Sequence, residues 1–362
     1  MATSPPVTNP LLSKARLATI INRFHQQHLA VVGDMAIDEM VYGKVDRLSR
    51  EAPVLILKHE RTDIILGAGA NAAHNVSCYG AKSHAIGLCG VDYYAGELKK
   101  AFERDGVLIE ALVADKTRPT TTKSRISGVV NASVTQQMVR MDREARTPIS
   151  QETEALLLEK IEAIIPQTNG LLLSDYAIGV VTPAVVASVQ QLATKHNIPW
   201  AVDSQQPLTA FQGASIMTPN QPEAEQNVGF AIEDKASLLK AGIQLLETTN
   251  AENMLITLGH DGMALFSKEA SCLWHIPVFN RSKVFDVTGA GDTVVSTLLL
   301  ANTCGASWLE AAVLGNLAAS IVVKQFGAAV TTQAEMLEAL DSLDDGLLQG
   351  ITKQNFQLAQ AI

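Results

Sequence analysis

Short apolar runs alternate with longer segments of helical spacing along most of the chain. Six runs have the length and composition of buried strands, and each ends in a polar or glycine-containing loop: residues 29–34, 83–88, 170–174, 199–202, 215–217 and 253–257. The segments between them carry apolar residues three and four positions apart, which predicts helices: 11–27, 72–79, 94–105, 151–165, 183–196 and 234–248. This alternation predicts an α/β fold whose mostly parallel sheet is covered by helices on both faces, with ligands at the carboxyl ends of the strands.

Two segments depart from this pattern. Residues 41–66 and 118–142 alternate β-branched and polar positions, as strands with one solvent-exposed face do. We expect them to form a small antiparallel β lid over the site; the alternative is two surface hairpins without a role. The predicted organisation is a loose tail at 1–10, one domain over 11–340 that includes both segments, and a peripheral segment at 341–362, where the chain becomes acidic and then polar.

Composition narrows the class of protein. The 362 residues are 47% hydrophobic and 18% charged, which allows a sizeable core. A net charge of −9 without a basic run argues against a nucleic-acid partner. The four cysteines are scattered, and the eight histidines show no metal-ligand spacing. No apolar run reaches the ~18 residues of a membrane span, and residues 1–10 lack the features of a secretory signal. We therefore expect a cytoplasmic protein that does not bind membranes.

The most informative motif is Asp286-Val287-Thr288-Gly289-Ala290-Gly291-Asp292-Thr293, which a long apolar helical pattern follows. Glycines let the backbone approach a ligand closely, and a helix that begins there directs unpaired N–H groups at an anion such as phosphate. Asp292 would then accept the proton of a hydroxyl that attacks the phosphate. The alternative is that Asp292 only caps the helix.

Two further loops could bind a sugar. Asp34 and Asp38 follow the first apolar run and could accept hydrogen bonds from vicinal hydroxyls, although their local pattern taken alone favours turn and cap roles. Gly67, Gly69 and Asn71 precede a helix, where small residues allow close approach and the amide can donate and accept. A tight loop that leads into a packed helix is the alternative for these three residues.

Two loops later in the chain suit a nucleotide. Asn220 and Glu223 stand three apart at a predicted helix start, where they could orient water on Mg²⁺ or form a plain cap. Thr257, Gly259 and Gly262 follow the last strand and could flank a ribose and its phosphates, or form a hairpin turn. The P-loop motif is absent, and so is the dinucleotide-binding glycine motif after the first strand. Phosphate binding must therefore rest on residues 289–292 and the helix after them.

Taken in order, these motifs resemble those of the ribokinase-like, or PfkB, family of carbohydrate kinases. The matching segments are 67–71, 220–223, 257–262 and 286–293. The resemblance implies a three-layer sandwich with a small β lid, and transfer of the γ-phosphoryl group of ATP to a sugar hydroxyl with Mg²⁺. The first open alternative is a kinase of another sugar or of a nucleoside. The second is a catalytically degenerate sugar-binding regulatory protein.

Within that family, four segments resemble the kinases of D-glycero-β-D-manno-heptose 7-phosphate, which act in ADP-heptose and lipopolysaccharide core synthesis. They are 45–54, 120–125, 139–142 and 173–177. Only the kinase half of the bifunctional form of that enzyme is implied, because the His-x-Gly-His motif of its nucleotidyltransferase half is absent. The chain departs from the pattern at Ile178 and Gln205, where lysines are usual, and in the order Ala68-Gly69.

The resemblance implies roles for individual residues. Asp292 deprotonates the anomeric hydroxyl, and Gly289, Ala290 and Gly291 form the anion hole. The sugar side comprises Asp34, Asp38, Gly67, Gly69 and Asn71, with Arg125, Arg140 or Lys123 as replacements for the missing lysines, since arginine suits phosphate. The nucleotide side comprises Asn220, Glu223, Thr257, Gly259, Gly262, Asn316 and Gly327, with Glu223 reaching Mg²⁺ through water. Asp286 would help to hold a monovalent cation such as K⁺. The resemblance also implies a homodimer formed through the lid.

Overall fold

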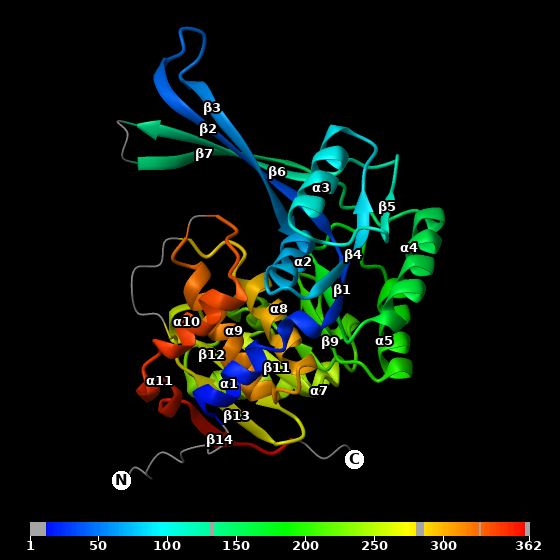
Figure 1. The fold of residues 1–362 in the computed structure, drawn as a ribbon, viewed down its shortest axis with the longest axis vertical. Helices are drawn as coiled ribbons and strands as arrows, with labels where there is room; N and C mark the ends of the chain where they lie inside the picture. The colour runs from blue at the N-terminus through cyan, green and yellow to red at the C-terminus, as the bar shows by residue number, and fades with distance from the viewer. Residues whose placement is uncertain (1–11, 131–133, 280–285, 326, 359–362) are drawn as a thin grey trace.

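The computed structural model describes residues 12–130, 134–279, 286–325 and 327–358. In this part of the chain a ten-stranded sheet has the order β14-β13-β12-β11-β10-β9-β8-β1-β4-β5 (Figure 1). Its parallel strands are β1 (His28–Gly33), β4 (Lys82–Cys89), β5 (Leu112–Ala114), β8 (Gly170–Asp175), β9 (Trp200–Ser204), β10 (Ile216–Met217) and β11 (Asn253–Thr257). Three antiparallel strands extend one edge: β12 (Met263–Ser267), β13 (Cys272–Ile276) and β14 (Thr352–Asn355). The predicted mostly parallel sheet is confirmed.

Helices cover both faces of this sheet. One layer holds α1 (Lys14–Ile21), α2 (Gly69–Cys78), α3 (Tyr93–Arg104), α8 (Ala290–Thr303), α9 (Trp308–Val322) and α10 (Gln333–Asp341). The other holds α4 (Gln151–Ile164), α5 (Pro183–His196), α6 (Gln221–Val228) and α7 (Lys235–Thr249). Adjacent strand residues alternate between the two cores: Val31 packs in the first and Val32 in the second. The three-layer sandwich is therefore confirmed, and the continuous apolar runs are strands buried on both faces.

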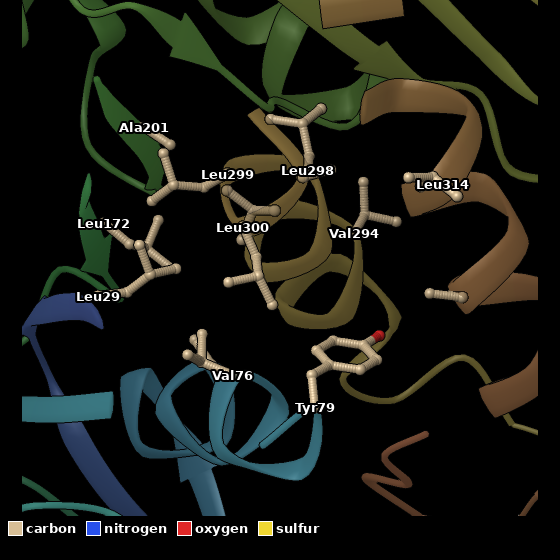
Figure 2. Close-up of a cluster of buried hydrophobic side chains, with 14 of the residues drawn as sticks. Leu29, Val76, Tyr79, Leu172, Ala201, Val294, Leu298, Leu299, Leu300 and Leu314 are labelled. Atoms are coloured by element: carbon tan, nitrogen blue, oxygen red, sulfur yellow. The ribbon is translucent and has the colours of Figure 1, made fainter. Parts of the chain in front are cut away.

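Helix α8 lies at the centre of the first core. Leu298, Leu299 and Leu300 are fully buried. Figure 2 shows them between α2, the neighbouring helix with Leu314, and the sheet residues Leu29, Leu172 and Ala201. The Tyr79 hydroxyl on the α2 side is 2.8 Å from Oγ1 of Thr297. Because its sides are packed in this way, the first turn of α8 has a fixed position at the carboxyl edge of the sheet.

A second sheet of four strands, here called the lid sheet, projects from this body (Figure 1). It consists of β2 (Met35–Leu48), β3 (Leu55–Ala68), β6 (Thr121–Val130) and β7 (Val134–Arg143) in the order β3-β2-β6-β7. Two antiparallel hairpins, β2–β3 and β6–β7, join along a parallel β2–β6 pair. The two segments that broke the helical pattern therefore form one sheet.

Several elements differ in extent from the sequence prediction. Strand β2 begins at Met35, so only Asp34 separates it from β1, because buried residues such as Ile37 pair with β3. The helix predicted over 11–27 is α1 followed by a short 3-10 helix, Phe24–Gln26. Residues 1–10, the predicted tail, lie outside the described residues. Within 341–362 the chain adds helix α11 (Asp345–Gln349) and the edge strand β14; the division of the chain at residues 10 and 340 stays a prediction.

Candidate active site

A cavity of about 190 Å³ opens at the carboxyl ends of the parallel strands, beside the first turn of α8. Parallel α/β sheets bind ligands at this edge. Its walls combine strand ends, the start of α6 and the start of α8. They comprise Asp175, Tyr176, Asp203, Ser204, Gln205, Thr218, Asn220, Glu223, Thr257, Gly289, Gly291, Asp292 and Val294. Segments that are distant in sequence therefore meet where the loop pattern predicted a site.

The start of α8 has the backbone of an anion-binding turn. Gly289 is the N-cap with φ of +77°, and a Cβ there would lie 2.7 Å from Nδ2 of Asn71. Both constraints favour glycine. Gly289 and Gly291 line the cavity, whereas the amide of Ala290 donates to the Val287 carbonyl oxygen at 3.2 Å. The helix therefore presents Gly289, Gly291 and its positive dipole end to this cavity, and Ala290 does not line it.

Asp292 is buried at this helix start, with 4% of its surface exposed. Its Oδ2 accepts a hydrogen bond from Nδ2 of Asn71 at 2.8 Å, and its Oδ1 accepts one from the Tyr176 hydroxyl at 2.8 Å. Burial raises its pKa to about 6, although both hydrogen bonds stabilise the ionised form. A carboxylate with this pKa is ionised at neutral pH and can still accept a proton, as a general base must.

A second cavity, of about 180 Å³, lies beneath the lid sheet. It is lined by Ala68, Thr121, Lys123, Arg140, Glu144, Arg146, Tyr176, Ile178 and Gln205. Tyr176 and Gln205 also line the first cavity, so the two cavities are neighbours. Three cationic side chains, those of Lys123, Arg140 and Arg146, meet in the second cavity and could receive an anion.

The cations of the second cavity already have carboxylate or aromatic neighbours. Arg140 makes two hydrogen bonds to the Asp142 carboxylate, at 2.8 and 2.7 Å, and Arg146 pairs with Glu144. Lys123 Nζ lies 4.8 Å from the centre of the Tyr176 ring. Arg140 and Arg146 are exposed, so these surface pairs contribute little to stability. A bound anion could therefore replace Asp142 or Glu144 as the partner of these arginines with little loss of stability.

Two residues expected on the nucleotide side form the helix cap that was one of their two predicted roles; their role toward Mg²⁺ stays a prediction. Asn220 caps α6, with Oδ1 accepting from the Glu223 amide at 3.0 Å, while Glu223 Oε2 accepts from the Asn220 amide at 2.9 Å. Both side chains also line the first cavity, as does Thr257 at the end of β11. Burial raises the pKa of Glu223. A capping box and a polar cavity wall therefore coincide.

Most of the residues expected on the sugar side lie outside the walls of the two cavities. Asp34 is fully buried, and its Oδ2 accepts from the amides of Tyr176 at 2.7 Å and Ile178 at 3.4 Å. Asp38 forms an ion pair with Arg125. Gly67, Gly69 and Asn71 contact other predicted site residues: a Cβ on Gly67 would lie 3.0 Å from the Asp38 carboxyl, one on Gly69 3.0 Å from the Asp34 carbonyl oxygen, and Asn71 donates to Asp292. Of the expected sugar residues, Arg140 and Lys123 line a cavity, the second one.

The other expected nucleotide residues also have structural contacts. Gly259 and Gly262 belong to the turn between the antiparallel strands β11 and β12, the hairpin alternative of the sequence analysis. Asn316 is buried and donates to the Pro277 carbonyl oxygen at 2.8 Å. Asp286 accepts from the amides of Thr288 at 2.9 Å and Gly327 at 3.0 Å. Burial opposes the ionised form of Asp286, but these hydrogen bonds outweigh it and lower its pKa.

Comparison with known proteins decides the family. The profile described as pfkB family carbohydrate kinase matches residues 26–335. The chain belongs to the pfkB family of carbohydrate kinases. The family resemblance predicted from the motifs is confirmed, and the protein is a kinase, a phosphotransferase that acts on carbohydrates.

Individual relatives agree with this assignment. The bifunctional protein HldE of Pelobacter propionicus is 37% identical over 330 residues, which cover 91% of this kinase and 66% of that protein. HldE of Geobacter metallireducens is 38% identical over 311 residues, with 86% and 62% covered. This kinase therefore spans slightly less than two thirds of the length of these relatives.

Solved structures share the fold. Phosphofructokinase-2 from Escherichia coli in complex with potassium superposes with a TM-score of 0.71 at 18% identity, covering 87% of this chain and 98% of that one. Arabidopsis thaliana ribokinase complexed with ribose and ATP has a TM-score of 0.67 at 18% identity, with the same coverage. In the described part of this kinase, we find no helix with the length and apolar character needed to span a bilayer.

The structure adds wall residues that the sequence analysis did not select. Tyr176 lines both cavities, Asp203 lines the first and Arg146 the second. Burial raises the pKa of Asp203 well above its usual range, and Asp292 and Glu223 add to this shift. The sequence feature that could have identified Tyr176 and Asp203 is their position, directly after a strand and near the end of a strand. Arg146 had no such feature, because it lies beyond the end of β7 at Arg143, and β7 is not a strand of the ten-stranded sheet.

Proposed function

We propose that this kinase transfers the γ-phosphoryl group of ATP to the anomeric hydroxyl of D-glycero-β-D-manno-heptose 7-phosphate. The observation that carries the proposal is the place of Asp292: a buried carboxylate in the first turn of α8, on the wall of the first cavity and next to a second cavity with three cations. Relatives named HldE and the heptose-kinase motifs of the sequence support this acceptor.

The chemical step needs little covalent participation by the protein. The anomeric O–H bond breaks and its proton passes to the Asp292 carboxylate. The freed oxygen forms a bond to the γ-phosphorus, while the bond from that phosphorus to the oxygen bridging it to the β-phosphorus breaks and ADP leaves. The backbone at Gly289 and Gly291, with the helix dipole, stabilises the charge on the transferred group.

The residues of the first cavity fit the phosphates of ATP and a hydrated divalent cation. Asn220, Glu223 and Thr257 line it together with the start of α8. Mg²⁺ held there through water would neutralise part of the phosphate charge. In this proposal Glu223 is the carboxylate that contacts Mg²⁺ through water. A K⁺ ion would bind near Asp286 and Gly327.

The second cavity supports an acceptor that already carries a phosphate. Two positions where heptose kinases usually have lysine are Ile178 and Gln205, and both line this cavity. Positive charge comes instead from the lid strands and the segment after them, at Lys123, Arg140 and Arg146. Arginine binds phosphate through two parallel hydrogen bonds. These three cations would supply the charge that a 7-phosphate needs, at positions other than those of the usual lysines.

The test is a panel of acceptors with ATP. Heptose 7-phosphate, fructose 6-phosphate, fructose, ribose and adenosine are compared by ADP release, and the product is identified by phosphorus NMR. We expect heptose 7-phosphate to have the highest kcat/KM, with a new signal from an anomeric phosphate. A preference for an unphosphorylated sugar or a nucleoside would contradict the proposed acceptor but would still agree with kinase activity. Ligand binding without transfer to any acceptor would favour the regulatory protein.

We also propose a homodimer through the lid sheet. Val139 and Met141 are 53% and 45% exposed. They stand two apart on β7, so they share the face opposite to Arg140. A second copy of the chain would cover these apolar side chains. Sedimentation should show a dimer that Val139→Lys dissociates, whereas Val91→Lys, at a 71% exposed site outside the lid sheet, leaves it intact. A monomeric wild-type protein would contradict this arrangement.

A further inference from the structure

Tyr176 stands between the two cavities and contacts the carboxylate to which the proposed function assigns the proton. It follows β8 directly and is partly buried. Its hydroxyl donates to Oδ1 of Asp292 at 2.8 Å, and Tyr176 lines both cavities. No other described residue except Gln205 lines both cavities. The phenol therefore lies where an acceptor sugar must approach Asp292.

The backbone of Tyr176 is fixed by buried groups. Its amide donates to Oδ2 of Asp34 at 2.7 Å, and the next residue, Ala177, has the strained φ of +57°. The carbonyl oxygen of Ile178 accepts from Nη2 of Arg118 at 2.7 Å. A loop held from both sides in this way keeps the Tyr176 hydroxyl at a defined place. It also gives Asp34 a role as the support of that loop.

The Asp292 carboxylate is held by one donor on each oxygen. Asn71, in the first turn of α2, donates to Oδ2, and Tyr176 donates to Oδ1. Each carboxylate oxygen can accept two hydrogen bonds. One acceptor position on each oxygen is therefore left for the sugar hydroxyl, and the two donors fix the plane of the carboxylate.

We propose that Tyr176 is a positioning residue that orients the Asp292 carboxylate and favours its ionised form. This inference rests on the proposed function, because it assumes that Asp292 accepts the proton of the acceptor. Tyr176 does not itself exchange a proton in the reaction, since burial and the nearby Asp292 charge raise the pKa of its phenol well above the usual range.

Other charged groups also act on Asp292. Lys123, from β6, stabilises the ionised form, while Asp38, from β2, opposes it. The Asp292 charge in turn helps to raise the pKa of Asp203, at the end of β9. Replacing Tyr176 by phenylalanine leaves these three groups in place and keeps the ring next to Lys123. The substitution therefore isolates the hydroxyl.

The experiment compares Tyr176→Phe with the wild type by two readouts. The first is the pH profile of kcat and kcat/KM with the best acceptor. Because a hydrogen bond to the ionised carboxylate is lost, we expect the acidic limb to move up by about one pH unit and kcat above that limb to fall at least ~5-fold, with the KM for ATP unchanged. Tyr94→Phe is the matched control: its hydroxyl donates to Glu39 at 3.1 Å, and Glu39 is not a wall residue of either cavity.

The second readout needs no turnover. Carbon NMR of protein labelled at the aspartate carboxyl carbon follows the titration of Asp292, assigned by the signal lost in Asp292→Asn. We expect the Asp292 pKa to rise in Tyr176→Phe and to stay unchanged in Tyr94→Phe. An unshifted Asp292 pKa, or a fall in kcat without movement of the acidic limb, overturns the inference. If the Asp292 pKa rises in Tyr176→Phe but the wild-type protein phosphorylates no acceptor, the role of Tyr176 is supported and the proposed function is rejected.

Discussion

The start of α8 and the lid sheet supply the two sides of the candidate site by different physical means. On α8, Asp292 is 4% exposed and each oxygen has a neutral donor, while the helix behind it is packed on all sides. On the lid and in the segment directly after it, Arg140 and Arg146 are exposed and pair with carboxylates that water also reaches. The core thus gives Asp292 a fixed position and a shifted pKa, whereas the arginines on the lid side can change their ion-pair partners.

This contrast separates the chemistry from the choice of acceptor. Orienting a base requires a site that does not move, which buried packing provides. Recognising one phosphorylated sugar among others requires charges that can change partners, and surface ion pairs allow this at little cost in stability. We infer that changes on the lid alter KM, whereas changes around α8 alter kcat or stability. Substitutions in each region test this division.

The largest expected effect is on stability, from truncation of the α8 core. Leu298→Ala removes a fully buried side chain, and we expect the free energy of unfolding to fall by about 2–5 kcal/mol. Urea denaturation followed by circular dichroism measures it. A loss below ~1 kcal/mol would mean that α8 is not packed as described.

Asp34 should make stability depend on pH. Burial raises its pKa to about 7, and Asp175 adds to the shift, so the folded state binds a proton more tightly than the unfolded state. Its ionisation therefore opposes folding, and stability falls as pH rises from about 4 to 7. Relative to wild type, Asp34→Asn should gain on the order of 4 kcal/mol across that window. Urea denaturation at pH 4, 5.5 and 7.5 tests this; a constant difference between the two proteins would refute it.

On the lid, loss of a cation should affect recognition of the acceptor. Arg140→Gln and Arg146→Gln should each raise the KM for a phosphorylated acceptor by about 10-fold, because a charged hydrogen bond is lost. The KM for ATP should not change. Arg61→Gln is the matched control, since Arg61 pairs with Asp63 two positions on, as Arg140 does with Asp142, but is not a wall residue of either cavity. Equal effects of all three substitutions would argue against a phosphate site.

The smallest effect is expected on the outer face of the lid. Val139→Ser, at a 53% exposed position, should change the free energy of unfolding of the monomer by less than about 0.5 kcal/mol. Denaturation at a protein concentration too low for dimers measures the monomer alone. A loss as large as that of Leu298→Ala would remove the distinction between the two regions.

The sequence predicted the framework well for a physical reason. Strands buried on both faces read as short apolar runs, and the residues after them occupy the carboxyl edge whatever the loops do in detail. The position of Asp292 at a helix start beside a cavity was predicted in the same way, because glycines directly before an apolar helix are typical of an anion-binding turn. Both predictions depend on local patterns that tertiary contacts reinforce.

Tertiary contacts decided what the sequence could not. A carboxylate such as Asp34 has the same local pattern whether it faces a ligand or accepts backbone amides from Tyr176, 142 residues away in sequence. Asn316 was expected near the nucleotide, but its partner is a carbonyl oxygen 39 residues earlier. Arg146 follows the lid strands without any motif. Which polar groups reach a cavity depends on such long-range pairing.

The central claim is that Asp292 takes the proton of the acceptor hydroxyl at the start of α8. The most direct test is a rapid-quench, single-turnover measurement of phosphoryl transfer by Asp292→Asn, with ATP affinity and thermal midpoint as controls for the fold. We predict that the transfer rate falls at least ~10²-fold while both controls stay near wild type. A near-normal rate of transfer in this variant would contradict the account.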